Sequence, residues 1–149
     1  MNPQTAARWA LDPQLEQDTV TVGDLPLSRL LASRDARYPW LLLVPRRPGA
    51  VELIDLDAAE QAQLMTEIAQ VSRALRDITG CAKLNVAALG NVVAQLHVHV
   101  IARRHDDAAW PRPVWGAAPP LAYEPAQRDA FVAAVRRQLG MTERPRSRY

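Results

Sequence analysis

Alternating and continuous hydrophobic positions predict five short strands. Residues 18–23 read DTVTVG, in which β-branched residues alternate with other residues before a glycine. Residues 38–45 form a continuous apolar run, which is typical of a central strand covered on both faces. The other predicted strands are 25–33, 82–89 and 94–103, and the short connection at 90–93 predicts a hairpin between the last two.

Helical spacing predicts one long helix at 57–79 and a C-terminal helix at 124–139. The long segment begins with Asp57 and Glu60, which can form a capping box, and it is followed by Gly80, which suits a left-handed C-cap. Its apolar residues recur three or four positions apart and therefore share one face: Leu64, Ile68, Val71, Leu75 and Ile78. A polar stretch at 4–11 is a further candidate for a helix.

The order of these elements predicts an α+β fold with a largely antiparallel sheet of about five strands, because strands and helices do not alternate regularly. We expect a single domain over residues 1–149. Its core would span about 18–104, followed by an arm rich in tryptophan and proline at 105–123 and the helix at 124–139.

Composition narrows the class of protein. The 149 residues are 48% hydrophobic, which excludes a disordered chain, and the net charge of +2 argues against a charge-driven nucleic-acid partner. The single Cys81 excludes an internal disulfide, and no apolar run reaches the length of a signal peptide or membrane span. We therefore expect a cytoplasmic protein with no membrane partner. Almost all of its positive charge comes from arginine, and Arg46 and Arg47 are candidates to contact phosphate groups.

Two histidines occupy one face of the predicted strand at 94–103. Because side chains alternate along a strand, Gln95, His97 and His99 share a face, and the apolar residues between them face the long helix. We expect the histidine face to be partly open, with successive rings roughly 6–7 Å apart.

This pattern leaves three interpretations. The first is metal ligation, which needs a third protein ligand, although only His105 is left among the histidines. The second is nucleophilic attack at phosphorus by a neutral imidazole whose other nitrogen is held, commonly by a backbone carbonyl. The third is a solvated strand face with two incidental histidines. The preceding turn favours the second, since Gly90 lets the backbone approach a ligand and the Asn91 amide can bond phosphate oxygens.

The stretch from Asn85 to Ile101, which ends in Gln95-Leu-His97-Val-His99-Val-Ile101, resembles the histidine-triad (HIT) superfamily. The resemblance extends over about 18–104. It implies a HIT-like fold, a homodimer, and a nucleotide hydrolase or nucleotidyl transferase acting on nucleoside phosphoramidates, dinucleoside polyphosphates or related conjugates. His97 would be the nucleophile that forms a covalent nucleotidyl intermediate, and His99 would contact the phosphate. The resemblance further implies that the triad binds no metal and that no cofactor is required, although a divalent cation could accompany the substrate phosphates.

The resemblance also assigns substrate-binding positions: Asn85, Gly90, Asn91, Val92 and Gln95. Three features depart from the family pattern. Gln95 replaces the first histidine, but any residue supplies the backbone carbonyl that orients the nucleophile. Asn91 is shorter than the family's glutamine, and Val92 replaces a residue that is often Ser or Thr, so fewer phosphate contacts are expected.

The third departure is the arm around Trp110 and Trp115, which we expect either to cover a pocket, its own or a partner subunit's, or to be surface packing. Asp35 lies near the position of the family's ribose contact, but a turn aspartate is the commoner explanation for this residue. The alternative function is a non-catalytic nucleotide-binding module of the same fold.

Overall fold

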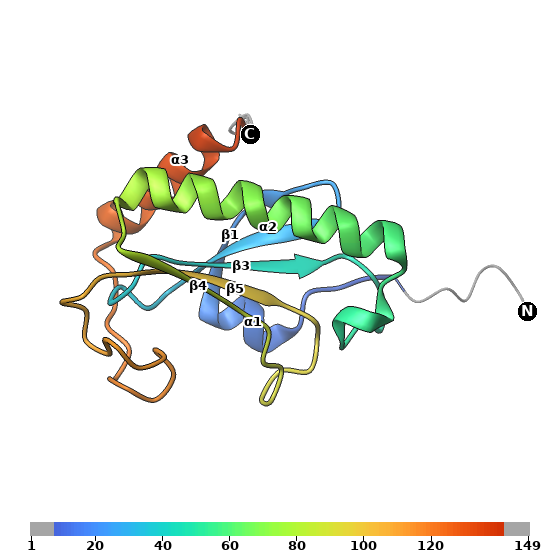
Figure 1. Cartoon of the computed structure of the whole chain (residues 1–149), viewed down its shortest axis with the longest axis horizontal. Helices are drawn as coiled ribbons and strands as arrows, with labels where there is room; N and C mark the ends of the chain where they lie inside the picture. Colours follow the sequence, from blue (N-terminus) through green and yellow to red (C-terminus); the bar gives the residue numbers. More distant parts are fainter. Residues whose placement is uncertain (1–7, 142–149) are drawn as a thin grey trace, which may run out of the picture.

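The computed structural model describes residues 8–141, which form an α+β fold around one antiparallel sheet (Figure 1). Its strands lie in the order β1-β2-β3-β5-β4, and each pairs antiparallel with its neighbours. This confirms the predicted fold class. The strands are β1 (Thr19–Asp24), β2 (Ser28–Ser33), β3 (Trp40–Pro45), β4 (Lys83–Ala87) and β5 (Val98–Arg103).

The long helix α2 (Ala58–Thr79) crosses one face of the sheet (Figure 1). The predicted capping box is present, because the Asp57 side chain accepts from Glu60 N and the Glu60 side chain from Asp57 N. Gly80 ends the helix with a φ of 61°, in the left-handed region where glycine carries no steric penalty. No helix within residues 8–141 has the length and apolar character needed to cross a membrane.

Three smaller helical elements complete the fold: α1 (Pro13–Asp18), the 3-10 helix η2 (Leu53–Asp55) and α3 (Pro125–Gln138). The helix predicted at 4–11 is wrong for residues 8–11, which form no regular structure, and residues 4–7 lie outside the described part. The helix begins later because the Asp12 side chain caps it by accepting from Gln14 N at 2.8 Å, and Pro13 suits the first turn.

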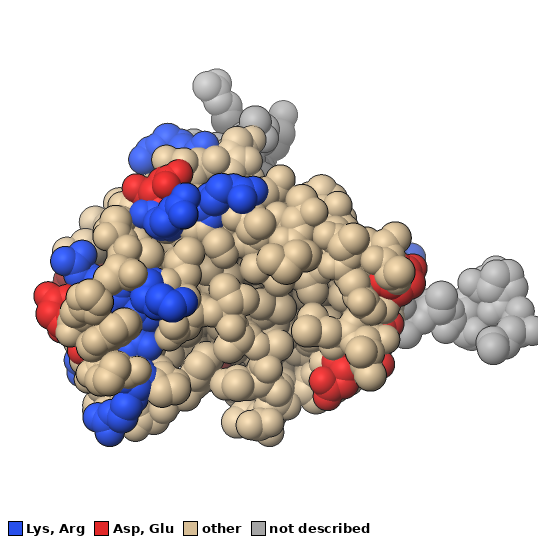
Figure 2. Space-filling model, in the orientation of Figure 1, with Lys and Arg blue, Asp and Glu red and all other residues tan. Residues whose placement is uncertain are grey.

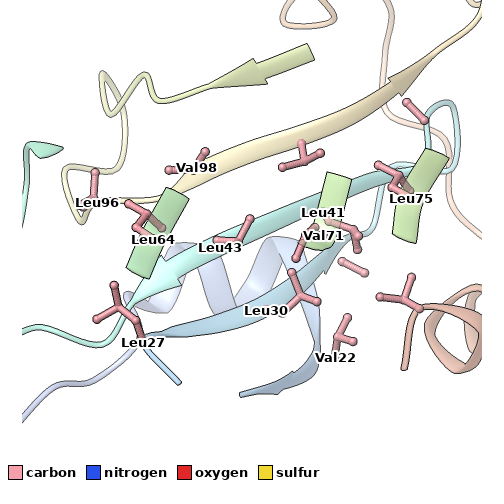
Figure 3. Close-up of a cluster of buried hydrophobic side chains, with 14 of the residues drawn as sticks. Val22, Leu27, Leu30, Leu41, Leu43, Leu64, Val71, Leu75, Leu96 and Val98 are labelled. Atoms are coloured by element: carbon pink, nitrogen blue, oxygen red, sulfur yellow. The ribbon is translucent and has the colours of Figure 1, made fainter. Parts of the chain in front are cut away.

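The main core fills the space between α2 and the sheet (Figure 3). Leu64, Val71 and Leu75 of α2 meet Leu96 and Val98 and apolar side chains of β2 and β3. The apolar residues of the predicted 94–103 segment therefore face the helix, as expected. Side chains of β3 are buried on both faces, which confirms it as a central strand.

Two smaller clusters cover the opposite face of the sheet. Near β2 and β3, Trp9 and Leu11 of the N-terminal segment pack with Leu15 of α1 against residues of these strands. Towards the other side, Ala109 and Val114 of the 105–123 arm pack with Tyr38 and Ile101. Both faces of the sheet are therefore covered, by α2 and α3 on one side and by α1 and chain segments without regular structure on the other.

The last strand is shorter than predicted. β5 begins at Val98, so the connection between β4 and β5 runs over 88–97 instead of 90–93. Residues 95–96 leave the sheet because they bond elsewhere: Leu96 N donates to Ala50 O at 3.0 Å, and Gln95 contacts the N-terminal segment. The strand at 25–33 likewise starts at Ser28, after a turn in which Leu25 N donates to Ser28 O.

Glu67 is a buried carboxylate on the apolar face of α2, which the hydrophobic pattern did not predict. Its two oxygens accept from Leu27 N at 2.8 Å and Ser28 N at 2.9 Å, and Gln63 Nε2 donates to one of them at 2.8 Å. The carboxylate thereby satisfies two backbone N–H groups at the start of β2 that would otherwise be buried without partners.

We predict that Glu67→Ala lowers the free energy of unfolding by about 3 kcal/mol, because two buried N–H groups lose their acceptors. Denaturant unfolding measures this change. The control is Gln63→Ala, which leaves both backbone hydrogen bonds in place and should cost less than about 1 kcal/mol. Equal losses in the two variants would contradict this assignment for Glu67.

Candidate functional site

The ring of His97 is held by the backbone two residues before it. His97 Nδ1 lies 2.6 Å from Gln95 O. A carbonyl oxygen only accepts hydrogen bonds, so Nδ1 carries the proton and, in the neutral ring, Nε2 keeps its lone pair. An attacking imidazole needs one ring nitrogen held and the other available. Here a backbone carbonyl holds the ring, so this requirement does not depend on which side chain residue 95 carries.

The ring of His99 is also held through Nδ1, but here Nδ1 accepts the hydrogen bond. Trp40 Nε1 donates to His99 Nδ1 at 3.0 Å. An indole N–H only donates, so Nδ1 is unprotonated and Nε2 carries the proton of the neutral ring. Burial, together with the nearby His97, lowers the pKa of His99 to about 4, so the ring is neutral near pH 7.

The two imidazoles therefore present different chemistry side by side. Their ring centroids lie 4.8 Å apart, closer than the expected spacing of roughly 6–7 Å because the side chains converge. His97 offers a lone pair on Nε2 and His99 offers an N–H on Nε2. A nucleophile next to a neutral hydrogen-bond donor suits a reaction in which negative charge develops on a bound oxygen.

The histidine face is covered, which corrects the expectation of a partly open surface. His97 is only 7% exposed and His99 only 6%. The indole of Trp40 packs 5.6 Å from the His99 ring and that of Trp115 packs 5.0 Å from it, centroid to centroid. The arm therefore covers a histidine of its own chain, and aromatic side chains far apart in sequence exclude water from this ring.

The side chain of Gln95 ties the N-terminal segment to the site. Gln95 Oε1 accepts from Asp12 N at 2.9 Å, and Gln95 Nε2 donates to Ala10 O at 2.8 Å. One amide thus satisfies a backbone donor and a backbone acceptor two residues apart. The residue that departs from the family pattern fixes residues 10–12 with its side chain while its own carbonyl orients His97.

A cavity of about 280 Å³ opens beside His97. Its walls are residues 51–54, which include most of η2, the loop at 88–90, and residues 95–97. Gly90 lines it with a φ of 73°, a conformation that favours glycine. Of the two histidines of the pair, His97 is the one that lines this cavity.

Comparison with known proteins agrees with this geometry. The HIT domain model matches residues 14–106. The chain belongs to the HIT family. A histidine triad protein from Bradyrhizobium japonicum is 62% identical, with a TM-score of 0.88 over 89% of this chain and 99% of that chain.

Two less similar structures share the fold. A HIT protein from Sinorhizobium meliloti 1021 is 41% identical, with a TM-score of 0.86 over 88% of this chain and 97% of that chain. The diadenosine triphosphate hydrolase of Plasmodium falciparum is 11% identical, with a TM-score of 0.56 over 94% of this chain and 87% of that chain. No curated protein matches the chain. HIT-fold proteins are generally nucleotide hydrolases or transferases.

Several positions that the HIT pattern assigns to substrate binding lie away from this cavity. Asn91 and Val92 are exposed in the loop and do not line it. Asn85 Oδ1 accepts from Arg103 Nη1 at 2.8 Å. Asp35 Oδ1 accepts from Arg37 N at 3.0 Å and from Leu121 N at 3.1 Å, so it holds a turn and the end of the arm.

Arg103 anchors the arm, a role that the sequence pattern did not reveal. This arginine is only 1% exposed and donates to both carboxylate oxygens of Asp107, at 2.7 and 3.0 Å, and to Arg112 O at 2.8 Å. Burial raises the pKa of Asp107, but the hydrogen bonds from Arg103 and from backbone N–H groups outweigh it and lower the pKa to about 2. The only hint in the sequence is the spacing of Arg103 and Asp107.

The other candidate arginines are also engaged. Arg46 Nη2 donates to Leu25 O at 2.7 Å and to Pro26 O at 3.1 Å, and Arg47 pairs with Glu60. Neither lines the cavity. Across residues 8–141, no group of three His, Cys, Asp or Glu side chains is placed to hold a metal ion.

We predict that Trp40→Phe raises the pKa of His99 above about 4, because the lost indole N–H bonds only the unprotonated Nδ1, while burial and His97 still hold the pKa below its ordinary value. In the intact protein His99 should stay neutral, with its proton on Nε2, from about pH 5 to 8. Long-range proton–nitrogen NMR of the imidazoles reports both the tautomer and the titration.

The matched control is Trp115→Phe. This indole also packs on His99 but donates no hydrogen bond to it, so the tautomer should persist. A His99 tautomer that survives Trp40→Phe unchanged would contradict the assigned donor.

Proposed function

We propose that this HIT protein is a nucleotide hydrolase or nucleotidyl transferase acting on nucleoside phosphoramidates, dinucleoside polyphosphates or related conjugates. The observation that carries the proposal is the hydrogen bond between His97 Nδ1 and Gln95 O. It leaves the Nε2 lone pair of a buried, oriented ring as the nucleophile, next to a cavity.

The proposed reaction has two steps. In the first, the Nε2 lone pair of His97 forms a bond to phosphorus, and the bond from phosphorus to the leaving group breaks with its electron pair. The leaving group takes a proton from water. In the second, water attacks phosphorus, the bond from Nε2 to phosphorus breaks, and the water gives up a proton to solvent. A different acceptor in place of water would make the reaction a transfer.

His99 supports these steps as a hydrogen-bond donor. Its Nε2–H lies in a ring 4.8 Å from His97 and is neutral near pH 7, so it can stabilise the charge that grows on a phosphoryl oxygen without giving up its proton. The loop amides around Gly90 are further candidates to contact phosphate. Four further residues stay predicted substrate contacts: Asn85, Asn91, Val92 and Asp35. Each of them would have to reorient to contact a bound substrate.

Gln95 is compatible with catalysis in this proposal. The group that orients His97 is the Gln95 carbonyl, which a histidine at the same position would supply equally. The side-chain amide has a separate task in holding residues 10–12.

We propose that the reaction needs no resident metal ion, because Nε2 of the neutral His99 carries a proton and has no lone pair for a metal, and residues 8–141 hold no group of three His, Cys, Asp or Glu side chains placed to bind one. A divalent cation could still enter with the substrate phosphates. Chelation by EDTA should leave turnover of a phosphoramidate unchanged. Loss of turnover that added zinc restores would favour the metal interpretation instead.

We also propose a homodimer. β4 forms one edge of the sheet, and its Val86 is half exposed, so its backbone is placed to pair with another strand. Light scattering should give twice the chain mass of 16.5 kDa. A particle of monomer mass that is fully active would contradict the dimer.

Intact-protein mass spectrometry tests the covalent step. We predict that the wild type, mixed with a nucleoside phosphoramidate or a dinucleoside polyphosphate, gains one nucleotidyl mass and that His97→Ala gains none. His99→Ala should form the adduct more slowly, by roughly 10²- to 10³-fold, as for loss of one oxyanion donor.

The control is His105→Ala. This ring packs on Trp110 and should leave adduct formation unchanged. Nucleotide binding without any adduct or released nucleotide would instead establish the non-catalytic binding module.

A further inference from the structure

We propose that Gln95 is a positioning residue for the His97 nucleophile, and that its side chain acts by bonding the N-terminal segment at residues 8–12, which fixes the carbonyl of Gln95 itself. Holding this segment and orienting His97 are then linked through the one residue that does both. The inference rests on the function proposed above and adds to it the parts of the chain that aim the nucleophile.

The strands of the sheet do not fix the position of Gln95. β5 pairs with β3 from Val98 and with β4 from His99, so Gln95 lies in the connection before the paired residues. Any residue supplies a carbonyl here, but the place of that oxygen depends on what holds the residue. The oxygen lies 2.6 Å from His97 Nδ1, so a displaced carbonyl turns the ring and moves the Nε2 lone pair off its target.

The side chain of Gln95 supplies this constraint. Its Oε1 accepts from Asp12 N at 2.9 Å and its Nε2 donates to Ala10 O at 2.8 Å. Because both ends of one planar amide are bonded to the same short segment, the amide is fixed in place and in rotation, and it restrains its own backbone. The next residue adds a further tie, since Leu96 N donates to Ala50 O at 3.0 Å.

The N-terminal segment is anchored by contacts of its own. Figure 1 shows it passing the connection between β4 and β5 on its way to α1. Trp9 and Leu11 pack in the apolar cluster that contains Leu15, and the Arg29 guanidinium lies 5.0 Å from the centroid of the Trp9 ring. Asp12 caps α1 through its side chain. The amide of Gln95 therefore bonds a segment that is already held in place.

Ionic attraction contributes little to this attachment. Figure 2 shows that Lys and Arg gather at the end that carries α3 and the 105–123 arm, whereas the end that carries η2 shows mainly uncharged and acidic residues. The described chain begins near the η2 end (Figure 1). The two bonds of the Gln95 amide join neutral groups, so dissolved salt does not screen them and their effect should be equal at low and high ionic strength.

The segment that Gln95 bonds lies outside the part of the chain that the family model describes. The HIT domain model matches residues 14–106, and residues 10–12 precede this match. The contact thus joins the shared domain to a stretch before it. Position 95 needs one donor and one acceptor on the same side chain, which an amide provides and an apolar or carboxylate side chain does not.

The test compares Gln95→Met with the wild type. Methionine keeps the length of glutamine and loses both hydrogen bonds to residues 10–12. The rate of adduct formation is measured at saturating adenosine 5′-phosphoramidate, together with the concentration that gives half of this rate. We expect the rate to fall by about tenfold, since a displacement of about 1 Å can cost about 10²-fold. The half-saturating concentration should change by less than about twofold, because the substrate contacts are kept.

The matched control is Gln61→Met. The Gln61 amide also donates to a main-chain carbonyl, Leu56 O at 2.8 Å, but it lies on α2 and does not line the cavity beside His97. Both variants should lose thermal stability, because each loses hydrogen bonds of the same kind. The rate of adduct formation should fall only in Gln95→Met.

A second variant reaches the same contact from the other side. Trp9→Ala removes the packing of the N-terminal segment and leaves the Gln95 side chain unchanged. We expect this variant to form the adduct more slowly as well. Adding Gln95→Met to it should lower the rate by less than about twofold further, because changes that act through one shared contact are not additive.

The outcomes separate the two proposals. No adduct and no turnover in the wild type overturns the proposed function, and this inference with it. Three results overturn the inference alone: a wild-type rate in Gln95→Met, an equal loss of rate in both glutamine variants, or a raised half-saturating concentration at an unchanged rate. Fully additive losses in the double variant also overturn it, because Gln95 and Trp9 would then act separately.

Discussion

The packing of α2 on the sheet is the constraint on which the site depends. Leu96, Val98 and Val100 are buried in the core under this helix, and side-chain alternation then directs His97 and His99 to the opposite face. Shifting this segment by one residue would bury two imidazoles under the helix and move three apolar side chains to the face that now carries the histidines. The direction of the catalytic candidates is therefore fixed by hydrophobic burial, with no polar interaction needed to select it.

A neutral His99 and two different histidine tautomers are the second consequence of the fold. Trp40 and Trp115 cover His99, and the resulting loss of solvation keeps its pKa low. The same ring accepts a hydrogen bond from Trp40, whereas His97 donates one to a carbonyl. Two chemically identical side chains thereby acquire different tautomers and different proposed tasks because one neighbour is an indole N–H and the other a backbone oxygen.

Contacts between distant parts of the chain close this face. The Gln95 amide holds residues 10–12, and the Arg103 guanidinium holds the arm that carries Trp115. The partners of the Gln95 amide lie 83 and 85 residues away in sequence, whereas the arm partners of Arg103 lie only four and nine residues after it. The sheet and α2 thus position the histidines, and these two side chains fix the segments that exclude water from the histidine site.

The sequence by itself determined the strands, the long helix and its caps, and the faces of the histidine segment. Each follows from local rules: the period of apolar residues, a capping box at Asp57 and a left-handed residue at Gly80. The HIT resemblance added the predicted roles of individual site residues. Only the tertiary structure decided that the histidine face is covered, that Asn85 and Asp35 are engaged elsewhere, and that Glu67 is buried. These outcomes depend on contacts such as that of Trp40 with His99, 59 residues apart, and a local pattern carries no information about such a partner.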